Sequence, residues 1–490
     1  MAALYTLRLV STAWRDVVDR MPSLWTIISS TFPDDVNRTS LTRSGSSPLM
    51  IYFPGWYMDI SPRFYKFLPI IEPHLQRCSF LALQLDPDFV DEVPWQSLPR
   101  VAALKILVEE LPDEDTKIIE IPDKILENIR DIDLDGQIPV NWPRTLGHLR
   151  GLRTLVLQEL SNNTITQEQI LSVLLASPGI ETLVINQLEI EDPPSNLSPS
   201  AEPISLPQLR SVTITTGGLL TNHLLRRIRP PPVVETLRIN RRNIPSHITT
   251  SFWEETMASW VPPVQRLYQN SSERVVGLNP TIGCYLQACR DHSLSIEFTG
   301  LPIPAALRWI QDVITAVDGG PGVLWLYAWD SVLEGNDILE VLQTIQGLTE
   351  ISVSRIYRLS QSPVEALLKV LGEPTADSIG TPDPRPTFPT LQKLSLHDWK
   401  WELDGIMDMV QRRYSMQSTG GQQVPELTLD ISPLCRWYLP ETETKIIPFY
   451  AAKALRELDG VKELRMGSSM WHWEFLAVIW DEEASAPARG

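Results

Sequence analysis

The sequence contains little cysteine, less glycine than proline, and a deficit of positive charge. Its 490 residues include four cysteines, 24 glycines and 41 prolines, and the formal net charge is −18. No CxxC pair occurs among Cys78, Cys284, Cys289 and Cys435, so neither a disulfide framework nor a metal site is expected, and low cysteine usage fits a reducing compartment. The negative charge disfavours nucleic acid as a partner, because DNA and RNA are polyanions.

Long apolar runs and catalytic motifs are also missing. No stretch approaches ~20 uncharged apolar residues, so no membrane span is predicted. The N-terminus is not expected to be a signal peptide, because Arg8, Arg15 and Asp16 interrupt its apolar residues. The sequence has no Gly-x-Ser-x-Gly, no P-loop, no Gly-x-Gly-x-x-Gly after a predicted strand and no His-Glu-x-x-His. We therefore expect a protein that is not an enzyme, has no cofactor or metal, and lies in the cytoplasm, the nucleus or both.

One pattern, apolar-x-x-apolar-x-apolar, recurs along the chain. Clear copies begin at Ile129, Leu152, Ile180, Leu209, Val234, Leu348, Leu391, Val424 and Val461, and weaker copies include Leu83–Leu85, Leu104–Ile106, Leu294–Phe298 and Leu324–Leu326. Between Leu104 and Leu237 the second apolar position recurs every 23 to 29 residues, which is the period of leucine-rich repeats. The final apolar-x-apolar predicts a short strand with one buried face. Because one such unit cannot bury its apolar face alone, the units must stack.

Helical signals lie between the predicted strands. Thr166 and Gln169 form a capping-box pair before an apolar run, and Ser362-Pro363-Val364-Glu365 is a second such start. The alternative, a doubly wound α/β fold, would need glycine-rich strand–helix turns, and these are missing. The predicted fold class is α/β, a leucine-rich-repeat-like curved solenoid of short parallel strands alternating with helices. It is expected to span residues 81–480, after a linker and lead-in at 29–80 and before a flexible tail at 481–490.

The first 28 residues differ from the rest. An apolar residue recurs every three or four positions, as on one helix face, at Leu4, Leu7, Val10, Trp14, Val17 and Met21. Pro22 is expected to end this helix, and Ser23-Leu24-Trp25 to open a short turn. The periodicity alone therefore predicts one amphipathic helix.

The residues of this segment resemble part of a known family. Leu9–Val17 (LVSTAWRDV) followed by Met21–Ile28 (MPSLWTII) resembles the second half of an F-box. Leu41–Leu49 resembles the segment that follows the F-box in mushroom-type fungal F-box proteins, in which a leucine-rich-repeat region often comes next. The family's first half, with its Leu-Pro-x-Glu-like start, has no counterpart here. Residues 1–28 are therefore interpreted as a partial, N-terminally truncated F-box-like helical segment.

The resemblance implies a function. F-box proteins of this kind dock through the F-box on a Skp-type adaptor of a cullin-based ubiquitin ligase, and their repeats select the protein to be ubiquitinated. The implied partners are thus that adaptor, its cullin ligase and a target protein. The residues implied in adaptor binding are Leu9, Val10, Trp14, Arg15, Val17, Pro22, Leu24 and Trp25. The alternative hypothesis is a leucine-rich-repeat scaffold or protein-interaction module without adaptor docking, whose N-terminal helix is only a cap.

Strand residues between the buried positions are expected to face the concave side of such a solenoid and to contact a partner. The residues predicted for this surface are Arg238, Trp325, Tyr327, Trp329, Lys393, Glu426 and Arg465. Exposed aromatic side chains and arginines are frequent anchors of interfaces. A loop insertion that covers the aromatic residues is the alternative, and strand propensity alone would also select the threonines found at many other open positions.

Overall fold

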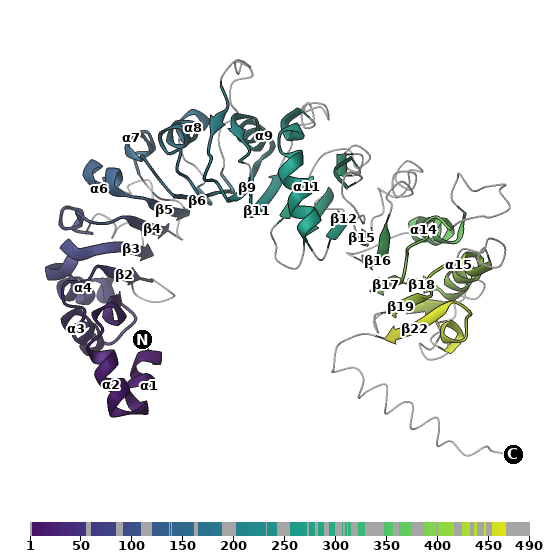
Figure 1. Ribbon diagram of the computed structural model, residues 1–490, viewed down its shortest axis with the longest axis horizontal. Helices are drawn as coiled ribbons and strands as arrows, with labels where there is room; N and C mark the ends of the chain where they lie inside the picture. The colour runs from purple at the N-terminus through teal and green to yellow at the C-terminus, as the bar shows by residue number, and fades with distance from the viewer. Residues whose placement is uncertain are drawn as a thin grey trace. The chain divides into compact units, whose positions relative to one another are not determined.

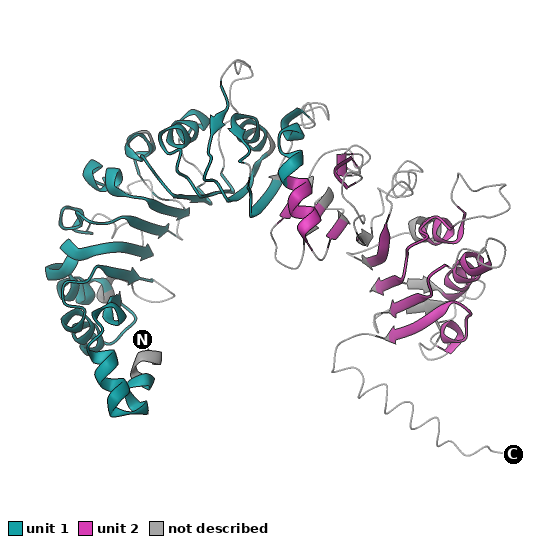
Figure 2. Ribbon diagram, in the orientation of Figure 1, with its two compact units in different colours: residues 1–263 teal, residues 264–490 magenta. Residues whose placement is uncertain are grey.

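The computed structural model of the chain contains two compact units (Figure 2). The described residues are 2–54, 60–84, 92–108, 120–136, 138, 140–160, 165–188, 202–231, 233–242, 255–271, 274–279, 283–288, 294–298, 306, 309–310, 312–314, 322–328, 347–355, 362–374, 386–397, 400–415, 424–431, 436–438, 445–446 and 453–466. The first unit comprises residues 1–263 and the second residues 264–490. Within the described ranges, no helix is long and apolar enough to cross a membrane.

The chain begins with two short helices, α1 (Ala2–Val10) and α2 (Thr12–Asp19), followed by the 3-10 turn η1 (Pro22–Trp25). The prediction of a single helix is therefore wrong. Ser11 has an extended backbone (φ −161°, ψ 164°), and its hydroxyl accepts a hydrogen bond from the Trp14 amide at 3.1 Å. Serine favours this N-cap geometry because its side chain competes for nearby amides. The apolar periodicity continues across the break and therefore does not reveal it.

A parallel sheet forms the body of the first unit (Figure 1). Its described strands are β1 (Ile27–Ser29), β2 (Leu49–Phe53), β3 (Cys78–Gln84), β4 (Ala103–Val108), β5 (Asp131–Gly136), β6 (Thr154–Gln158), β7 (Thr182–Asn186), β9 (Ser211–Gly217) and β11 (Thr236–Arg242). Each strand pairs in parallel with the next one named. A separate pair joins β8 (Ile204–Ser205) to β10 (Ile228–Arg229). The predicted α/β class, with parallel strands alternating with helices, is confirmed.

The strands of this sheet pair in register, so equivalent side chains form continuous ladders. One buried ladder contains Leu104, Ile132, Leu155, Leu183, Val212 and Leu237, and a second contains Ile106, Leu134, Leu157, Ile185, Ile214 and Ile239. Every member of both ladders is at most 1% exposed. A one-residue slip of any strand would move its ladder residues to the opposite face, so the apolar period specifies this register.

After α1, α2 and η1, the next described helices of the first unit are α3 (Asp34–Arg43) and α4 (Ile60–Ile71). They continue with η2 (Glu72–Arg77), η3 (Trp95–Ser97), α6 (Asp123–Asn128), α7 (Trp142–His148), α8 (Gln167–Ala176) and α9 (Gly218–Arg227). Helices α6 to α9 lie on the same side of the sheet in Figure 1. The predicted capping box is present at α8. The Thr166 amide donates to Gln169 Oε1 at 3.0 Å, and the Gln169 amide donates to Thr166 Oγ1 at 3.3 Å.

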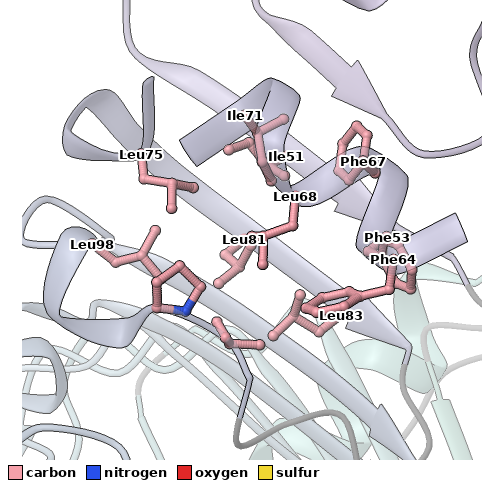
Figure 3. Close-up of a pocket in the computed structure, with 12 residues that line it drawn as sticks. Ile51, Phe53, Phe64, Phe67, Leu68, Ile71, Leu75, Leu81, Leu83 and Leu98 are labelled. Atoms are coloured by element: carbon pink, nitrogen blue, oxygen red, sulfur yellow. The ribbon is translucent and has the colours of Figure 1, made fainter. Parts of the chain in front are cut away.

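Apolar side chains of α4 pack on β2 and β3 around a small cavity (Figure 3). Its lining includes Phe64 and Phe67 from α4, Ile51 and Phe53 from β2, and Leu81 from β3. The cavity measures about 20 Å³, and its lining side chains are apolar, so a water molecule would find no polar partner there. We interpret it as a packing gap rather than as a ligand site.

The sheet begins earlier in the chain than the predicted repeats. The prediction placed the first repeat at residue 81, whereas β2 and the start of β3 lie in the segment assigned to the linker and lead-in, and β1 spans the boundary between that segment and the F-box-like segment. Strand β2 has the same alternation of buried and half-buried residues as the later strands. Pro48 and Cys78 occupy the positions where the clear copies have a leading Leu, Ile or Val, which is why the pattern weakens there.

The second unit contains parallel and antiparallel pairs. Its described elements are α11 (Val261–Asn270, which begins in the first unit), β12 (Arg274–Asn279), β13 (Gly283–Ala288), β14 (Leu294–Phe298), β15 (Gly322–Ala328), β16 (Leu348–Arg355), α14 (Ser362–Gly372), β17 (Lys393–His397), β18 (Lys400–Glu402), α15 (Leu403–Ser415), β19 (Leu427–Ile431), β20 (Arg436–Tyr438), β21 (Lys445–Ile446) and β22 (Val461–Met466). Strands β12, β15, β16, β17, β19 and β22 pair in parallel in that order. Strand β13 pairs antiparallel with both β12 and β14, and β18, β20 and β21 form a separate small sheet.

Strand β13 is the one that runs against the parallel strands, and the weaker repeat copy at Leu294–Phe298 runs in the same direction as β12. These residues form β14, which lies antiparallel to β13. Three residues separate β12 from β13, and five separate β13 from β14. Links this short allow antiparallel pairing, whereas a parallel crossover needs a dozen or more residues. Leu294 and Ile296 are nevertheless buried, as the pattern predicts.

Candidate interaction surfaces

Exposed apolar side chains concentrate at the N-terminus. Ten large apolar side chains are exposed among the described residues, and seven of them lie within the first 27 residues. These seven are Leu7, Leu9, Val10, Trp14, Val17, Met21 and Ile27, and the other three are Tyr65, Leu175 and Val233. Single exposed apolar residues are ordinary, whereas a cluster of them marks a surface for interaction. We call Leu9, Val10, Trp14, Val17 and Met21 the N-terminal apolar surface.

Helix α2 carries both the exposed and the buried part of this region. Trp14 and Val18 are four residues apart and therefore lie on the same side of the helix. Val18 is buried, but Trp14 is 49% exposed and Leu9, on α1, is 80% exposed. The unit thus covers one end of this helix face and leaves the end around Trp14 open.

Trp25 anchors these helices to α3. Its side chain is fully buried, and its Nε1 donates to the Val18 carbonyl at 2.8 Å. The Arg43 guanidinium lies 4.5 Å from the centre of the Trp25 ring, where a cation is attracted by the ring face. Asp19 forms ion pairs with Arg43 and, at 2.9 Å, with Arg8. These contacts hold α1 and α2 in a defined position on the first unit.

The residues implied in adaptor binding therefore divide into two groups. Those that are exposed are Leu9, Val10, Trp14, Arg15, Val17 and Pro22, while Leu24 is half-buried and Trp25 is inside the unit. Trp25 does not belong to the surface that a partner meets, and we assign it a positioning role. No local sequence signal separates it from Trp14, because Arg43, which covers its ring, is distant in the chain.

The face opposite the buried ladders, which we call the open face of the first unit, presents side chains in rows. One row contains Tyr52, Ala82, Lys105, Asp133, Val156, Val184, Thr213 and Arg238, and a neighbouring row contains Phe80, Ala103, Asp131, Thr154, Thr182, Ser211 and Thr236. These side chains are half-buried, except Arg238, which is exposed. Arg238, a predicted contact residue, thus lies on the open face at its last strand.

Negative charge gathers on β5 of this open face. Asp131, Asp133 and Asp135 occupy successive open positions, and Lys105 on β4 pairs with Asp133 at 2.6 Å. Partial burial raises the pKa of Asp135, and the carboxylates of Glu159 and Asp133 raise it further, while Lys105 acts in the opposite direction. The negative charge of these carboxylates therefore exceeds the positive charge of Lys105.

The predicted contact residue Lys393 lies on the open side of β17 in the second unit. Its ammonium pairs with Glu350 on β16 at 2.8 Å and with Asp430 on β19 at 3.5 Å. Burial lowers the pKa of Lys393, but the hydrogen bond and charge of Glu350, together with Asp430, outweigh this and leave the pKa raised. Lys393 therefore forms ion pairs with the neighbouring strands of its own sheet, and these ion pairs contribute to the stability of that sheet.

The other residues predicted to contact a partner have different surroundings. Arg465 on β22 is exposed and pairs with the glutamate two residues before it at 2.8 Å, and Glu426 is exposed directly before β19. Trp325 and Tyr327 lie on β15, with backbone positions on the same side as the open positions of β16. Trp329 lies outside the described residues. Contact through the three aromatic side chains stays a prediction.

Candidate reactive groups are few in the described part of the chain. Within it, no cluster of three or more His, Cys, Asp or Glu side chains is arranged to hold a metal ion. Cys78 is fully buried, and this burial raises the pKa of its thiol to about 12. A thiol that stays protonated at neutral pH is a poor nucleophile.

The sequence matches no protein-family model, and a search of curated proteins also gives no match. The N-terminal apolar surface, the open faces of the strands and the F-box resemblance are therefore the basis on which a function is assigned.

Proposed function

We propose that this chain is a non-enzymatic substrate-recognition subunit of a Skp-cullin-F-box ubiquitin ligase. In this proposal the N-terminal apolar surface docks on the Skp-type adaptor, and a leucine-rich-repeat-like curved solenoid binds the target protein. The observation that carries it is the concentration of exposed apolar side chains at the residues that resemble an F-box. Burying these side chains against an adaptor would contribute roughly 25 cal/mol per Å² of apolar area removed from water.

Trp14 is the best candidate for the centre of the adaptor interface. It is half-exposed on α2, and Leu9, Val10 and Val17 surround it in sequence with exposed apolar side chains. Tryptophan is enriched among the few residues that dominate the binding energy of protein interfaces. The contacts of Trp25 with Val18 and Arg43 support the same proposal, because they fix the helices before an adaptor binds and so lower the ordering cost of docking.

The regular stacking of the first unit supports the proposed solenoid. Successive strands repeat the same two buried ladders, and each of α6, α7, α8 and α9 lies between consecutive strands of the sheet in the chain. Repeats that contact chiefly their neighbours build extended surfaces suited to binding other proteins. The open face would then serve for target binding, while α1 and α2 remain available for the adaptor.

Co-purification tests the proposal directly. The full chain is co-expressed with the Skp-type adaptor of the same organism, in wild-type form and as a Leu9→Ser/Trp14→Ser variant. A matched control, Leu175→Ser/Val233→Ser, removes two apolar side chains that are exposed elsewhere in the first unit. Trp25 is left intact because its replacement would disturb the fold. Circular dichroism and thermal unfolding establish that the variants are folded.

We expect the adaptor to co-purify with the wild type and the control but not with the Leu9→Ser/Trp14→Ser variant. Equal co-purification with both variants, or none with the folded wild type, would contradict adaptor docking. The chain would then be a leucine-rich-repeat scaffold or interaction module without a ligase, in which α1 and α2 serve only as a cap.

A further inference from the structure

The open face of the first unit has one region with a distinct chemistry. Four successive strands, β2 to β5, place aromatic side chains at one end and carboxylates at the other. We call this region the acidic–aromatic face, and its residues are Tyr52, Phe80, Lys105, Asp131, Asp133 and Asp135. The remaining strands of the open face carry mainly threonine, serine and valine.

The aromatic end consists of two rings on neighbouring strands. The ring centres of Tyr52 and Phe80 lie 5.0 Å apart with an interplanar angle of 38°, and both side chains remain half-buried. Along the two rows, the next side chains towards β5 are Ala82 and Ala103. Because alanine has a short side chain, no bulky group of these rows stands between Phe80 and Asp131.

The spacing of the strands brings both ends within reach of one short peptide segment. Neighbouring strands lie about 4.8 Å apart, so Phe80 on β3 and Asp131 on β5 are separated by roughly 10 Å along their row. A segment that crosses the strands would meet the ring faces first and the carboxylates two strands later. Both features would be within the span of a few residues of extended chain.

The acidic end offers two carboxylates besides the one that pairs with Lys105. Lys105 contacts Oδ2 of Asp133, and Oδ1 of Asp133 is inaccessible, so the carboxylates that a ligand can reach are those of Asp131 and Asp135, which are half-buried. Glu159, which follows β6, adds a further carboxylate whose charge acts on Asp135. Guanidinium groups suit this combination because they donate paired hydrogen bonds to carboxylates and also stack on aromatic rings.

We propose that the acidic–aromatic face binds an extended segment of a partner protein that carries two or more arginines. One guanidinium stacks on Tyr52 and Phe80, and a second pairs with Asp131 and Asp135. This inference rests on the proposed function in one respect, namely that the bound segment belongs to the target of the ligase. The binding itself requires neither the adaptor nor the cullin.

The test measures peptide binding to the full chain alone. The probes are fluorescein-labelled peptides of alternating Arg and Ser, Lys and Ser, and Glu and Ser, followed by fluorescence anisotropy at physiological ionic strength. Asp131→Asn/Asp135→Asn removes two charges from the acidic–aromatic face. The control Glu127→Gln/Glu168→Gln removes two charges from exposed positions on α6 and α8 and therefore gives the same net charge.

We expect the Arg–Ser peptide to bind more tightly than the Lys–Ser peptide, and the Glu–Ser peptide not to bind. Loss of two charge pairs should weaken Arg–Ser binding roughly tenfold in Asp131→Asn/Asp135→Asn and less than about twofold in the control. Tyr52→Leu should reduce the preference for Arg over Lys. Equal weakening in both double variants would indicate attraction to the net charge of the chain and overturn the proposal, as would the absence of Arg–Ser binding.

Adaptor co-purification with the same variants separates the two proposals. We expect Asp131→Asn/Asp135→Asn to retain the adaptor, because its substitutions lie on β5 and not on α1 or α2. Peptide binding without any adaptor docking would remove the ligase function and keep the acidic–aromatic face as a binding site. Adaptor docking without peptide binding would keep the ligase function and remove the acidic–aromatic face as a binding site.

Discussion

Asn37 offers a sharp test of how the first unit protects the edge of its sheet. Strand β1 pairs with β2 on one side. On the other side, the fully buried amide of Asn37 on α3 takes the place of a neighbouring strand. Its Oδ1 accepts a hydrogen bond from the Ser29 amide at 3.3 Å, and its Nδ2 donates to the carbonyls of Ser29 at 2.9 Å and Phe32 at 3.3 Å. One side chain thus satisfies both backbone groups of an edge residue.

The cost of removing this side chain follows from the groups that it leaves unpaired. Asn37→Ala leaves the buried amide of Ser29 without a partner and removes one hydrogen bond from the half-buried Phe32 carbonyl, whereas the Ser29 carbonyl keeps a hydrogen bond from the Phe32 amide at 3.0 Å. An unpaired buried polar group costs about 1–3 kcal/mol. We therefore expect a loss of roughly 2 kcal/mol in the free energy of unfolding of the first unit, or about thirtyfold in its equilibrium constant. Asn37→Asp should be at least as harmful, because its carboxylate cannot donate to the two carbonyls.

Hydrogen–deuterium exchange with mass spectrometry and urea unfolding would measure the loss. Exchange should accelerate most in peptides that cover β1, and the exposed edge should promote self-association. Asn128→Ala is the control, because Asn128 is exposed and donates a single hydrogen bond to the Pro99 carbonyl at 3.3 Å. Its cost should stay within about 0.5 kcal/mol. A loss below about 1 kcal/mol for Asn37→Ala, or no local change in exchange at β1, would refute the reasoning.

Three further predictions concern ionisable groups. Because burial raises the pKa of the Cys78 thiol to about 12, iodoacetamide at neutral pH should label it only after denaturation, and peptide mass spectrometry that finds rapid labelling of the folded chain would contradict this. Asp135 has a raised folded-state pKa, so its ionised form opposes folding above that pKa, and besides burial the charge of Glu159 contributes to the rise. Glu159→Gln should therefore raise the melting temperature at neutral pH, and this gain should shrink as the pH falls through the pKa of Asp135. An unchanged melting temperature at neutral pH would count against this prediction. Lys393→Met leaves two half-buried carboxylates without their cation and should destabilise the second unit by about 1–2 kcal/mol at low salt and less at high salt; a loss no larger than that of replacing the exposed Lys369 would contradict the role of this ion pair.

The buried core of the first unit was predictable because its signal is local and repeated. Residues such as Leu155 and Leu157 follow a period of two within each strand, and the same apolar-x-x-apolar-x-apolar pattern returns after each helix. The break at Ser11 was not predictable from periodicity, since the apolar face continues through it. The reversed direction of β13 was also hidden, because an alternating strand looks the same in parallel and antiparallel pairs, and only the short links around it distinguish the two.

The candidate surfaces were predictable only where one short segment decides them. The sequence placed Leu9 and Trp14 together and, by resemblance, assigned them a role, but it could not separate Trp14 from Trp25. That difference depends on Arg43, whose guanidinium reaches the ring of Trp25 from another helix. The acidic–aromatic face needs more still, because Tyr52 and Asp131 belong to strands that become neighbours in one surface only through the register of the whole sheet.

The two proposed contacts differ in chemistry as well as in position, and ionic strength can therefore separate them. The N-terminal apolar surface lies on α1 and α2, and its binding should persist or strengthen with salt, since apolar burial is not screened. The acidic–aromatic face lies on β2 to β5, and arginine binding there should weaken as salt screens its half-exposed carboxylates. A salt titration of a complex of chain, adaptor and Arg–Ser peptide should release the peptide first and leave the adaptor bound. Simultaneous release of both would mean that neither surface acts by the physical interaction assigned to it.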